Sequence, residues 1–196
     1  ASVAGDVEAT FAEAGHTVIS NAKNHRMDAD VPLLVPEINQ NHLELLTNQS
    51  NQRGWSGRIV TNPNCSTIIL TMALAPLLSF GLRAVNVTTL QAISGAGYPG
   101  VASLDIVGNV IPFINGEEEK MEAETKKVFG SLKDGAVRPH DVAISAHTTR
   151  VPVINGHTLM ISVGLNRQAK MEELLRTFRD FSGPPKVATL PNAPKN

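Results

Sequence analysis

Apolar residues in the first part of the chain change from helical to strand-like spacing. Residues 6–14 carry apolar side chains at helical intervals and end at Gly15, which is typical of a helix end, and residues 16–20 are predicted to form a short strand. A helix that leads into a strand is the second half of a βαβ unit. Since the first strand of such a unit is absent from the sequence, we expect a fragment that begins inside an α/β unit.

The pattern from residue 58 to residue 79 places a short strand directly before a strongly apolar helix. Residues 58–61 are strand-like, Asn62-Pro63-Asn64-Cys65 follows, and residues 66–79 have apolar side chains on every face. A helix that is apolar all round is buried, and Pro76 is expected to kink or end it. The sequence therefore predicts Cys65 at the junction of a strand and the amino end of a buried helix.

The second half of the chain mixes strands and helices without a regular alternation. The predicted elements are a strand over 84–93, a charged helix over 117–129, strands over 141–153 and 157–165, and an amphipathic helix over 168–181. This mixture indicates an α+β architecture. Asn155-Gly156 is a strong turn signal and predicts a hairpin in which the two flanking strands pair.

Composition and charge exclude several classes of function. The 196 residues carry a formal net charge of -1 and 4% aromatic residues, so no basic field or aromatic stripe indicates binding to nucleic acid. No apolar run has the length that spans a bilayer, and no signal-peptide pattern is visible. The single cysteine excludes an internal disulfide and a thiolate zinc cluster, and the histidines lack metal-ligand spacing. We expect a cytoplasmic protein without metal, nucleic-acid or membrane partners.

The position of Cys65 favours nucleophilic chemistry. Asn62 or Asn64 can cap the helix that follows, and the free N–H groups of the first turn then favour an anion near the sulfur. The same groups can stabilise the oxyanion of a tetrahedral adduct. On this motif alone, a buried and unreactive thiol beneath a capped helix is the alternative.

A histidine and an arginine near the predicted hairpin offer a base and an anion-binding group. With a two-residue turn at Asn155-Gly156, Ile154 pairs with His157, and Arg150 shares their face about 13 Å along the strand. His157 can take a proton from a thiol or give one to an oxyanion, and Arg150 can hold a carboxylate through two parallel hydrogen bonds. The same two residues on an ordinary exposed hairpin would show this spacing without any function.

In combination these motifs resemble the aspartate-semialdehyde dehydrogenases, in the branch found in archaea and fungi. The glyceraldehyde-3-phosphate dehydrogenases and the N-acetylglutamyl-phosphate reductases carry different residues around the cysteine. The resembling features are, in chain order, Asn62-Pro63-Asn64-Cys65-Ser66-Thr67, Gln91, the loop Ser94-Gly95-Ala96-Gly97, the pair Glu117 and Lys120, and the pair Arg150 and His157. The resemblance implies a catalytic and dimerisation domain at residues 39–196, similar to the C-terminal domain of glyceraldehyde-3-phosphate dehydrogenase, and a remnant of a Rossmann unit at residues 1–38.

The resemblance also implies a role for each of these residues. Cys65 and His157 are catalytic. The implied ligand-binding residues are Gln91, Arg150 and Glu117 for the substrate, Arg26, Asn64 and Lys120 for phosphate, and Ser94, Gly95, Ala96 and Gly97 for the nicotinamide half of NADP. For the four-residue loop, a plain tight turn is the competing explanation.

The implied reaction is reversible and passes through a thioester on the cysteine. It interconverts L-4-aspartyl phosphate and L-aspartate 4-semialdehyde, with NADP as cofactor and inorganic phosphate as co-substrate, on the route to lysine, threonine and methionine. The family also implies a homo-oligomer, either a dimer or a tetramer. Most of the NADP site is missing from the sequence, so we expect the chain alone to bind NADP poorly and to be inactive.

Three other functions fit parts of the same pattern. A malonyl-CoA reductase resembles this branch but transfers its acyl group to coenzyme A. A cysteine hydrolase would need only Cys65 and His157, and a non-catalytic dimerisation module would need neither. Phosphate dependence of the NADP reaction, hydrolysis of an activated ester without nicotinamide, and the reactivity of the thiol at neutral pH distinguish these alternatives.

Overall fold

The computed structural model describes residues 3–193, which form two compact units. Unit 1 contains the described residues of 1–64, 124–140 and 175–196, and unit 2 contains 65–123 and 141–174. The chain passes from one unit to the other between Asn64 and Cys65, and again inside a helix after Ala123. The sequence-based boundary between residues 38 and 39 stays a prediction, because units of compact packing and family domains need not share their limits.

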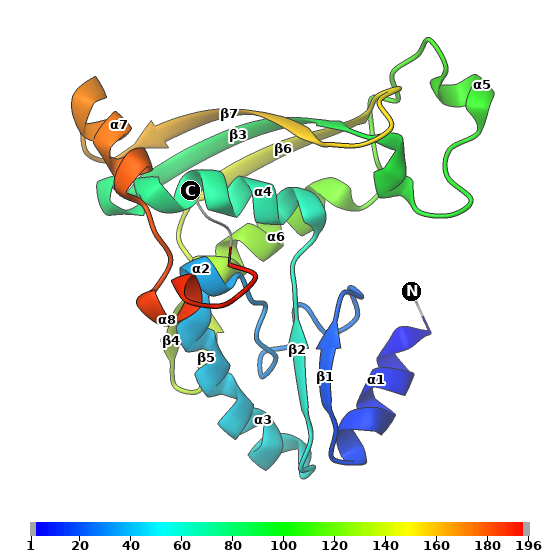
Figure 1. Cartoon of the computed structure of the whole chain (residues 1–196), viewed down its shortest axis with the longest axis vertical. Coiled ribbons are helices and arrows are strands. Elements are labelled where there is room, and N and C mark those ends of the chain that lie inside the picture. The colour runs from blue at the N-terminus through cyan, green and yellow to red at the C-terminus, as the bar shows by residue number, and fades with distance from the viewer. Residues whose placement is uncertain (1–2, 194–196) are drawn as a thin grey trace. The chain divides into compact units, whose positions relative to one another are not determined.

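Unit 1 is built on a two-stranded parallel sheet formed by β1 (Thr17–Ser20) and β2 (Arg58–Thr61). Helix α1 (Ala4–Glu13) leads into β1, so the helix and strand predicted at the start of the chain are confirmed. Parallel strands need a crossover connection. It contains α2 (Pro36–Asn39), the 3-10 helix η1 (Gln40–Glu44) and α3 (Leu45–Arg53) (Figure 1).

A small apolar core holds α1 against the sheet of unit 1. Ala12, Val31 and Ile59 are fully buried, and Val18 and Trp55 pack against them. Unit 1 is completed by a hairpin of β4 (Ser131–Lys133) and β5 (Ala136–Arg138) and by the short helix α8 (Pro185–Ala188). The sequence pattern did not predict this hairpin, because each of its strands has only three residues.

Unit 2 contains a three-stranded sheet in the order β6-β3-β7, with β3 (Leu82–Gln91) in the centre. β3 pairs in parallel with β6 (Ala143–Arg150) and antiparallel with β7 (Thr158–Leu165). Helix α4 (Cys65–Leu74) runs along one face of this sheet (Figure 1). It is followed by the 3-10 helix η2 (Ala75–Phe80), so the predicted end of the buried helix at the proline is confirmed.

The predicted hairpin around Asn155-Gly156 is wrong. β6 and β7 are not neighbours, because β3 lies between them and pairs with both. Residues 151–157 instead cross the carboxyl end of β3, where the Ser94 N–H donates to the Ile154 carbonyl at 3.1 Å. A turn signal reports only local geometry, whereas β3 satisfies the hydrogen bonds of both flanking strands. The crossing segment carries His157 to the end of β3.

Helix α6 (Glu117–Val128) covers the outer edge of β6. The Thr148 N–H donates to the carboxylate of Glu118 at 2.9 Å, and the Ala146 N–H donates to that of Glu122 at 3.1 Å. These side chains satisfy edge donors that would otherwise need another strand or water. The remaining helices are η3 (Ile93–Ala96), α5 (Ser103–Ile106) and α7 (Met171–Asp180). Within residues 3–193, every helix is too short or too polar to cross a bilayer.

Candidate active site

The thiol of Cys65 lies within hydrogen-bonding distance of an imidazole. Cys65 is the first residue of α4, and it is exposed to solvent. Its Sγ is 3.3 Å from Nε2 of His157. Free N–H groups in the first turn of a helix favour negative charge on a group at this position. The structure therefore brings the two residues predicted to be catalytic into direct contact.

The backbone of Ala92 fixes the protonation pattern of His157. The Ala92 N–H donates a hydrogen bond to Nδ1 of His157 at 3.1 Å, so Nδ1 is an acceptor and carries no proton. The neutral ring then has its proton on Nε2, which faces the sulfur of Cys65. In this arrangement the Nε2–H of the imidazole can donate a hydrogen bond to the sulfur. The same Nε2–H can donate to an oxyanion that forms beside the sulfur.

Two causes lower the pKa of His157. Burial lowers it below the ordinary value of 6.5, and the positive charge of Arg150 lowers it further. The negative charge of Glu117 acts in the opposite direction but is the weakest of the three influences. The imidazole is therefore neutral at neutral pH, in agreement with the hydrogen bond that its Nδ1 accepts.

Arg150 is the last residue of β6 and is held by the same main-chain residue as the histidine. Its Nη1 donates to the Ala92 carbonyl at 2.7 Å, and Arg150 is 5% exposed. Burial lowers the pKa of Arg150, and the charges of Glu117 and Cys65 oppose this. A guanidinium keeps its charge in spite of such a shift. Ala92 thus positions both side chains, and the sequence gives no sign of this because only its backbone is used.

Gln91 is the strand partner of Arg150 at the end of β3. Its side chain is 1% exposed and donates to Oγ1 of Thr89 at 3.4 Å. Gln91 lies on the buried face of the sheet, and its role as a substrate-binding residue stays a prediction.

A glycine allows the loop after β3 to approach the side chains of His157 and Arg150 closely. A Cβ atom added to Gly95 would lie 2.8 Å from Nη1 of Arg150 and 2.8 Å from Cε1 of His157. Real Cβ contacts are essentially never this short, so a side chain at this position would displace one of the two groups. The sequence signal was the glycine itself, although the resemblance assigned it to cofactor binding only.

A cavity of about 370 Å³ lies beside Arg150. Its walls are formed by Gly95, Ala96, Val101, Ile111, Phe113, Ile114, Asn115, Glu117 and Arg150. The volume suits a small molecule, and the walls are mostly apolar with a few converging polar groups. The cavity offers one guanidinium and one carboxylate, which together match a ligand that carries both a negative and a positive charge.

The acid and the lysine predicted at the start of α6 form an ion pair with each other. Nζ of Lys120 is 2.7 Å from Oε1 of Glu117, at a separation of three residues in one helix. Residues three apart share a helix face, so this pairing follows from their spacing. Lys120 is therefore brought next to the cavity wall through Glu117.

The other predicted phosphate-binding residues, Arg26 and Asn64, belong to unit 1. A buried glutamate of α6 connects them: Nη1 of Arg26 is 3.0 Å from Oε1 of Glu124, and the Asn64 N–H donates to Oε2 at 2.6 Å. The sequence analysis missed Glu124. A signal for it exists, because Glu124 follows Met121 by three residues on the helix stripe that ends at Val128, and both of these apolar residues are buried.

The loop of residues 94–100 has the glycine spacing of a dinucleotide-binding motif but not its structure. Gly95, Gly97 and Gly100 have the spacing Gly-x-Gly-x-x-Gly, but the loop leaves β3 to form η3 and opens no long helix, as a phosphate-binding turn requires. Gly97 has φ 69°, and a Cβ there would meet no atom within 4 Å, so the loop is open at this point. An open glycine loop can accept the flat face of a nicotinamide ring.

Two family models match the chain. The model described as semialdehyde dehydrogenase, dimerisation domain, matches residues 74–195, and the model described as semialdehyde dehydrogenase, NAD binding domain, matches residues 1–46. Aspartate-semialdehyde dehydrogenase of Archaeoglobus fulgidus is 49% identical over 193 residues, which are 98% of this chain and 55% of the relative. Malonyl CoA reductase (NADP) of Metallosphaera sedula is 36% identical over 195 residues, or 98% of this chain and 55% of the relative.

Solved structures agree with this assignment of the fold. The structure of aspartate-semialdehyde dehydrogenase with NADP from Candida albicans is 41% identical and has a TM-score of 0.82, over 92% of this chain and 53% of that one. The chain thus spans little more than half the length of the curated relatives that it matches. The expected α+β fold, similar to the C-terminal domain of glyceraldehyde-3-phosphate dehydrogenase and preceded by part of a Rossmann unit, is confirmed. The chain therefore belongs to the semialdehyde dehydrogenase family.

Proposed function

We propose that the protein containing this chain is an NADP-dependent aspartate-semialdehyde dehydrogenase that works through a covalent thioester on Cys65. The observation that carries the proposal is the 3.3 Å contact between Sγ of Cys65 and Nε2 of His157. Relatives named aspartate-semialdehyde dehydrogenase, at 49% and 45% identity over nearly the whole chain, support the choice of reaction.

In the oxidative direction, the thiolate of Cys65 attacks the aldehyde carbon of L-aspartate 4-semialdehyde and forms a carbon–sulfur bond. The carbonyl oxygen becomes the oxyanion of a tetrahedral adduct, which accepts a hydrogen bond from Nε2 of His157. NADP, when bound beside this adduct, would supply the hydride acceptor. Loss of the hydride turns the oxyanion back into a carbonyl and leaves a thioester on Cys65. A phosphate oxygen then attacks the thioester carbon, the thiolate leaves, and L-4-aspartyl phosphate is released.

The charges of the cavity support an amino-acid substrate. The guanidinium of Arg150 can hold the substrate carboxylate in a bidentate pair, and the carboxylate of Glu117 can hold its ammonium group. A malonyl group has no ammonium to pair with Glu117, so the acid in the cavity wall favours aspartate semialdehyde over the malonyl-CoA alternative. Gln91 is proposed to contact the same substrate after a change of its rotamer.

We assign the phosphate co-substrate to Arg26, Asn64 and Lys120. Arg26 and Lys120 supply positive charge for a dianion, and Asn64 supplies a side-chain amide beside the nucleophile in the chain. Ser94, Gly95, Ala96 and Gly97 are proposed to lie against the nicotinamide ring. The ion pair with Glu117 holds the ammonium group of Lys120 beside the cavity wall.

The protein is also proposed to be a cytoplasmic homo-oligomer, either a dimer or a tetramer. The name of the matching dimerisation-domain model supports self-association. The face of the unit 2 sheet that carries Asn86, His147 and Met160 is exposed, and Met160 is 53% exposed. A second copy on that face would bury these side chains.

The test is a steady-state assay of the full-length protein with L-aspartate 4-semialdehyde, NADP and inorganic phosphate. We expect NADPH formation that depends on phosphate and disappears in the Cys65→Ser variant, because a hydroxyl cannot replace the thiolate as nucleophile and leaving group. Undiminished turnover of Cys65→Ser would contradict the mechanism. Dependence on coenzyme A in place of phosphate would favour the malonyl-CoA reductase, and ester hydrolysis without NADP would favour a hydrolase.

A further inference from the structure

Glu124 is a buried acid whose two oxygens contact different segments of unit 1. It is 2% exposed. Oε1 accepts a hydrogen bond from Nη1 of Arg26 at 3.0 Å, and Oε2 accepts one from the Asn64 N–H at 2.6 Å. The donors are 38 residues apart in sequence, as their numbers show. A single carboxylate thus connects the loop that carries Arg26 to the residue directly before Cys65.

The guanidinium of Arg26 is buried but only partly satisfied. Arg26 is 7% exposed, Nη2 donates to the Asn21 carbonyl at 2.8 Å, and Nε has no hydrogen-bond partner among the described residues. A buried charge needs a counter-charge and directed hydrogen bonds to hold one orientation. Glu124 supplies the counter-charge to Nη1, while the buried Nε–H keeps an unused hydrogen bond among the described residues.

The backbone of the same loop is fixed by a second residue of α6. Lys127 is 4% exposed, and its Nζ donates to the carbonyls of Arg26, Asp28 and Val31 at 2.7, 2.7 and 2.9 Å. Lys127 follows Glu124 by three residues, so both side chains leave one face of the helix. Arg26 is therefore held at its main chain by Lys127 and at its guanidinium by Glu124.

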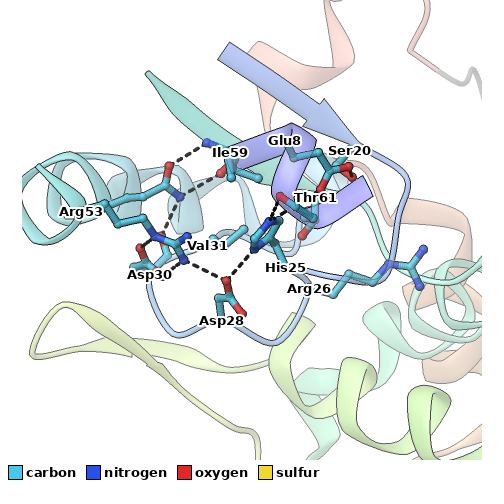
Figure 2. Close-up of polar contacts among 12 residues, drawn as sticks. Glu8, Ser20, His25, Arg26, Asp28, Asp30, Val31, Arg53, Ile59 and Thr61 are labelled. Carbon is cyan, nitrogen blue, oxygen red and sulfur yellow. Dashed lines mark hydrogen bonds and ion pairs between the residues drawn. The ribbon is translucent and has the colours of Figure 1, made fainter. Parts of the chain in front are cut away.

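The opposite side of the loop is held by another set of charges. Arg53 donates to Asp28 at 2.9 Å and also contacts Asp30, and Nδ1 of His25 lies 2.8 Å from Asp28 (Figure 2). In Figure 2 the side chain of Arg26 points away from these contacts. The orientation of its guanidinium is therefore left to Glu124 and to the Asn21 carbonyl.

We propose that Glu124 is a positioning residue, whose carboxylate orients the guanidinium of Arg26 for an anionic co-substrate and fixes the peptide N–H of Asn64 directly before the nucleophile. This inference rests on the proposed function of Cys65 and Arg26. Both donors need an acceptor, and only a carboxylate has an acceptor oxygen for each. A glutamine offers one acceptor and one NH2 group, so it can satisfy only one of them.

The experiment compares Glu124→Gln with the wild type in the full-length protein. We expect the KM for inorganic phosphate to rise about tenfold, because a charge-assisted hydrogen bond to Arg26 is lost. The KM for the aldehyde should stay within about twofold, since Arg150 and Glu117 are unchanged. Alkylation of Cys65 by iodoacetamide without substrates should slow about threefold as the peptide before it loosens.

Glu119→Gln is the matched control, because Glu119 is exposed on the same helix and lies outside the proposed site. Its phosphate KM and its alkylation rate should equal those of the wild type. If Glu124→Gln lowers only the melting temperature, and its phosphate KM and alkylation rate match the control, the residue is merely structural and the proposal is overturned.

The double variant Arg26→Gln/Glu124→Gln covers the case in which the single variant does not fold, since it removes the unpaired buried charge. We expect slow alkylation of Cys65 in the double variant and wild-type alkylation in Arg26→Lys alone, which keeps a counter-charge so that Oε2 of Glu124 still holds Asn64. Equal alkylation rates in these two variants would overturn the positioning of Asn64. A wild-type protein without phosphate-dependent NADPH formation would instead refute the proposed function, and the alkylation comparison would still test Glu124.

Discussion

The surroundings of Cys65 in unit 2 and the loop around Arg26 in unit 1 differ in how a functional side chain is held in place. Cys65 is exposed and contacts His157, which the main chain of Ala92, directly after β3, orients. Arg26 is buried and is held by a helix through its side chain and its backbone. A reacting atom must stay accessible to its substrate, so the sulfur is positioned by one neighbouring side chain that the main chain orients. A buried charge is tolerated only when other groups satisfy it.

The largest expected effect comes from removing the imidazole that contacts the thiol. His157→Ala should lower kcat about 10³-fold, which is within the range found for general acid–base residues. Steady-state kinetics of the full-length protein measures this value. His16→Ala is the control, because His16 is exposed and its ring contacts Phe11 of α1. A loss of less than about tenfold would show that the thiol works without the imidazole.

The contribution of the buried loop around Arg26 is measured as a change in the free energy of unfolding. Lys127→Met should lower the free energy of unfolding by about 3 kcal/mol, because three buried carbonyls lose their donor. Urea unfolding followed by circular dichroism gives this value. Lys133→Met, at an exposed position of the β4–β5 hairpin, should change it by less than about 0.5 kcal/mol. Similar values for the two variants would contradict a structural role for Lys127.

The close approach of the loop to His157 and Arg150 gives a smaller effect on activity. Gly95→Ala should lower kcat/KM about tenfold, because its Cβ would meet both side chains at 2.8 Å and displace one of them. Gly54→Ala is the control for a general loss of stability, since Gly54 has φ 68° and open space around it, so that a Cβ there strains the backbone and meets no other group. If both variants lose activity equally, reduced stability rather than the contact at Gly95 is responsible.

The smallest effect is a change in the pKa of His157, measured by NMR titration of the imidazole. The pKa should lie below 6.5, because burial and Arg150 both disfavour the protonated ring. Arg150→Met removes a positive charge, so the pKa should rise. Glu117→Gln removes a negative charge, so the pKa should fall further. Shifts of the same sign in the two variants would rule out this electrostatic explanation.

The sequence predicted those parts of the site that depend on local pattern. The apolar residues after Cys65 placed it at the start of a buried helix, and Pro76 marked the helix end. Strand order could not be predicted in this way, because the turn signal at Asn155-Gly156 says nothing about β3, a partner more than sixty residues earlier in the sequence. The main-chain contacts of Ala92 have no side-chain signature at all.

The contacts of Glu124 and Lys127 in unit 1 could not be predicted from the sequence pattern for another reason. Glu124 and Lys127 belong to a helix whose sequence is rich in acids and lysines, and only their place on the buried stripe distinguishes them. Their partners are between 60 and 101 residues away in sequence. Spacing along one helix can identify which side chains are buried, but it cannot identify what they contact.

The segment of residues 151–157, which crosses the end of β3, offers a place where the protein can be engineered. Its exposed middle can be changed without moving the residues at its two ends. Arg150 is fixed by strand pairing, and His157 is fixed by the Ala92 N–H, so both ends of this connection are anchored. The five residues from 152 to 156 include Ile154, which is 75% exposed. Insertions or replacements at its tip would reshape the entrance for longer aldehydes while the thiol and its imidazole stay in place.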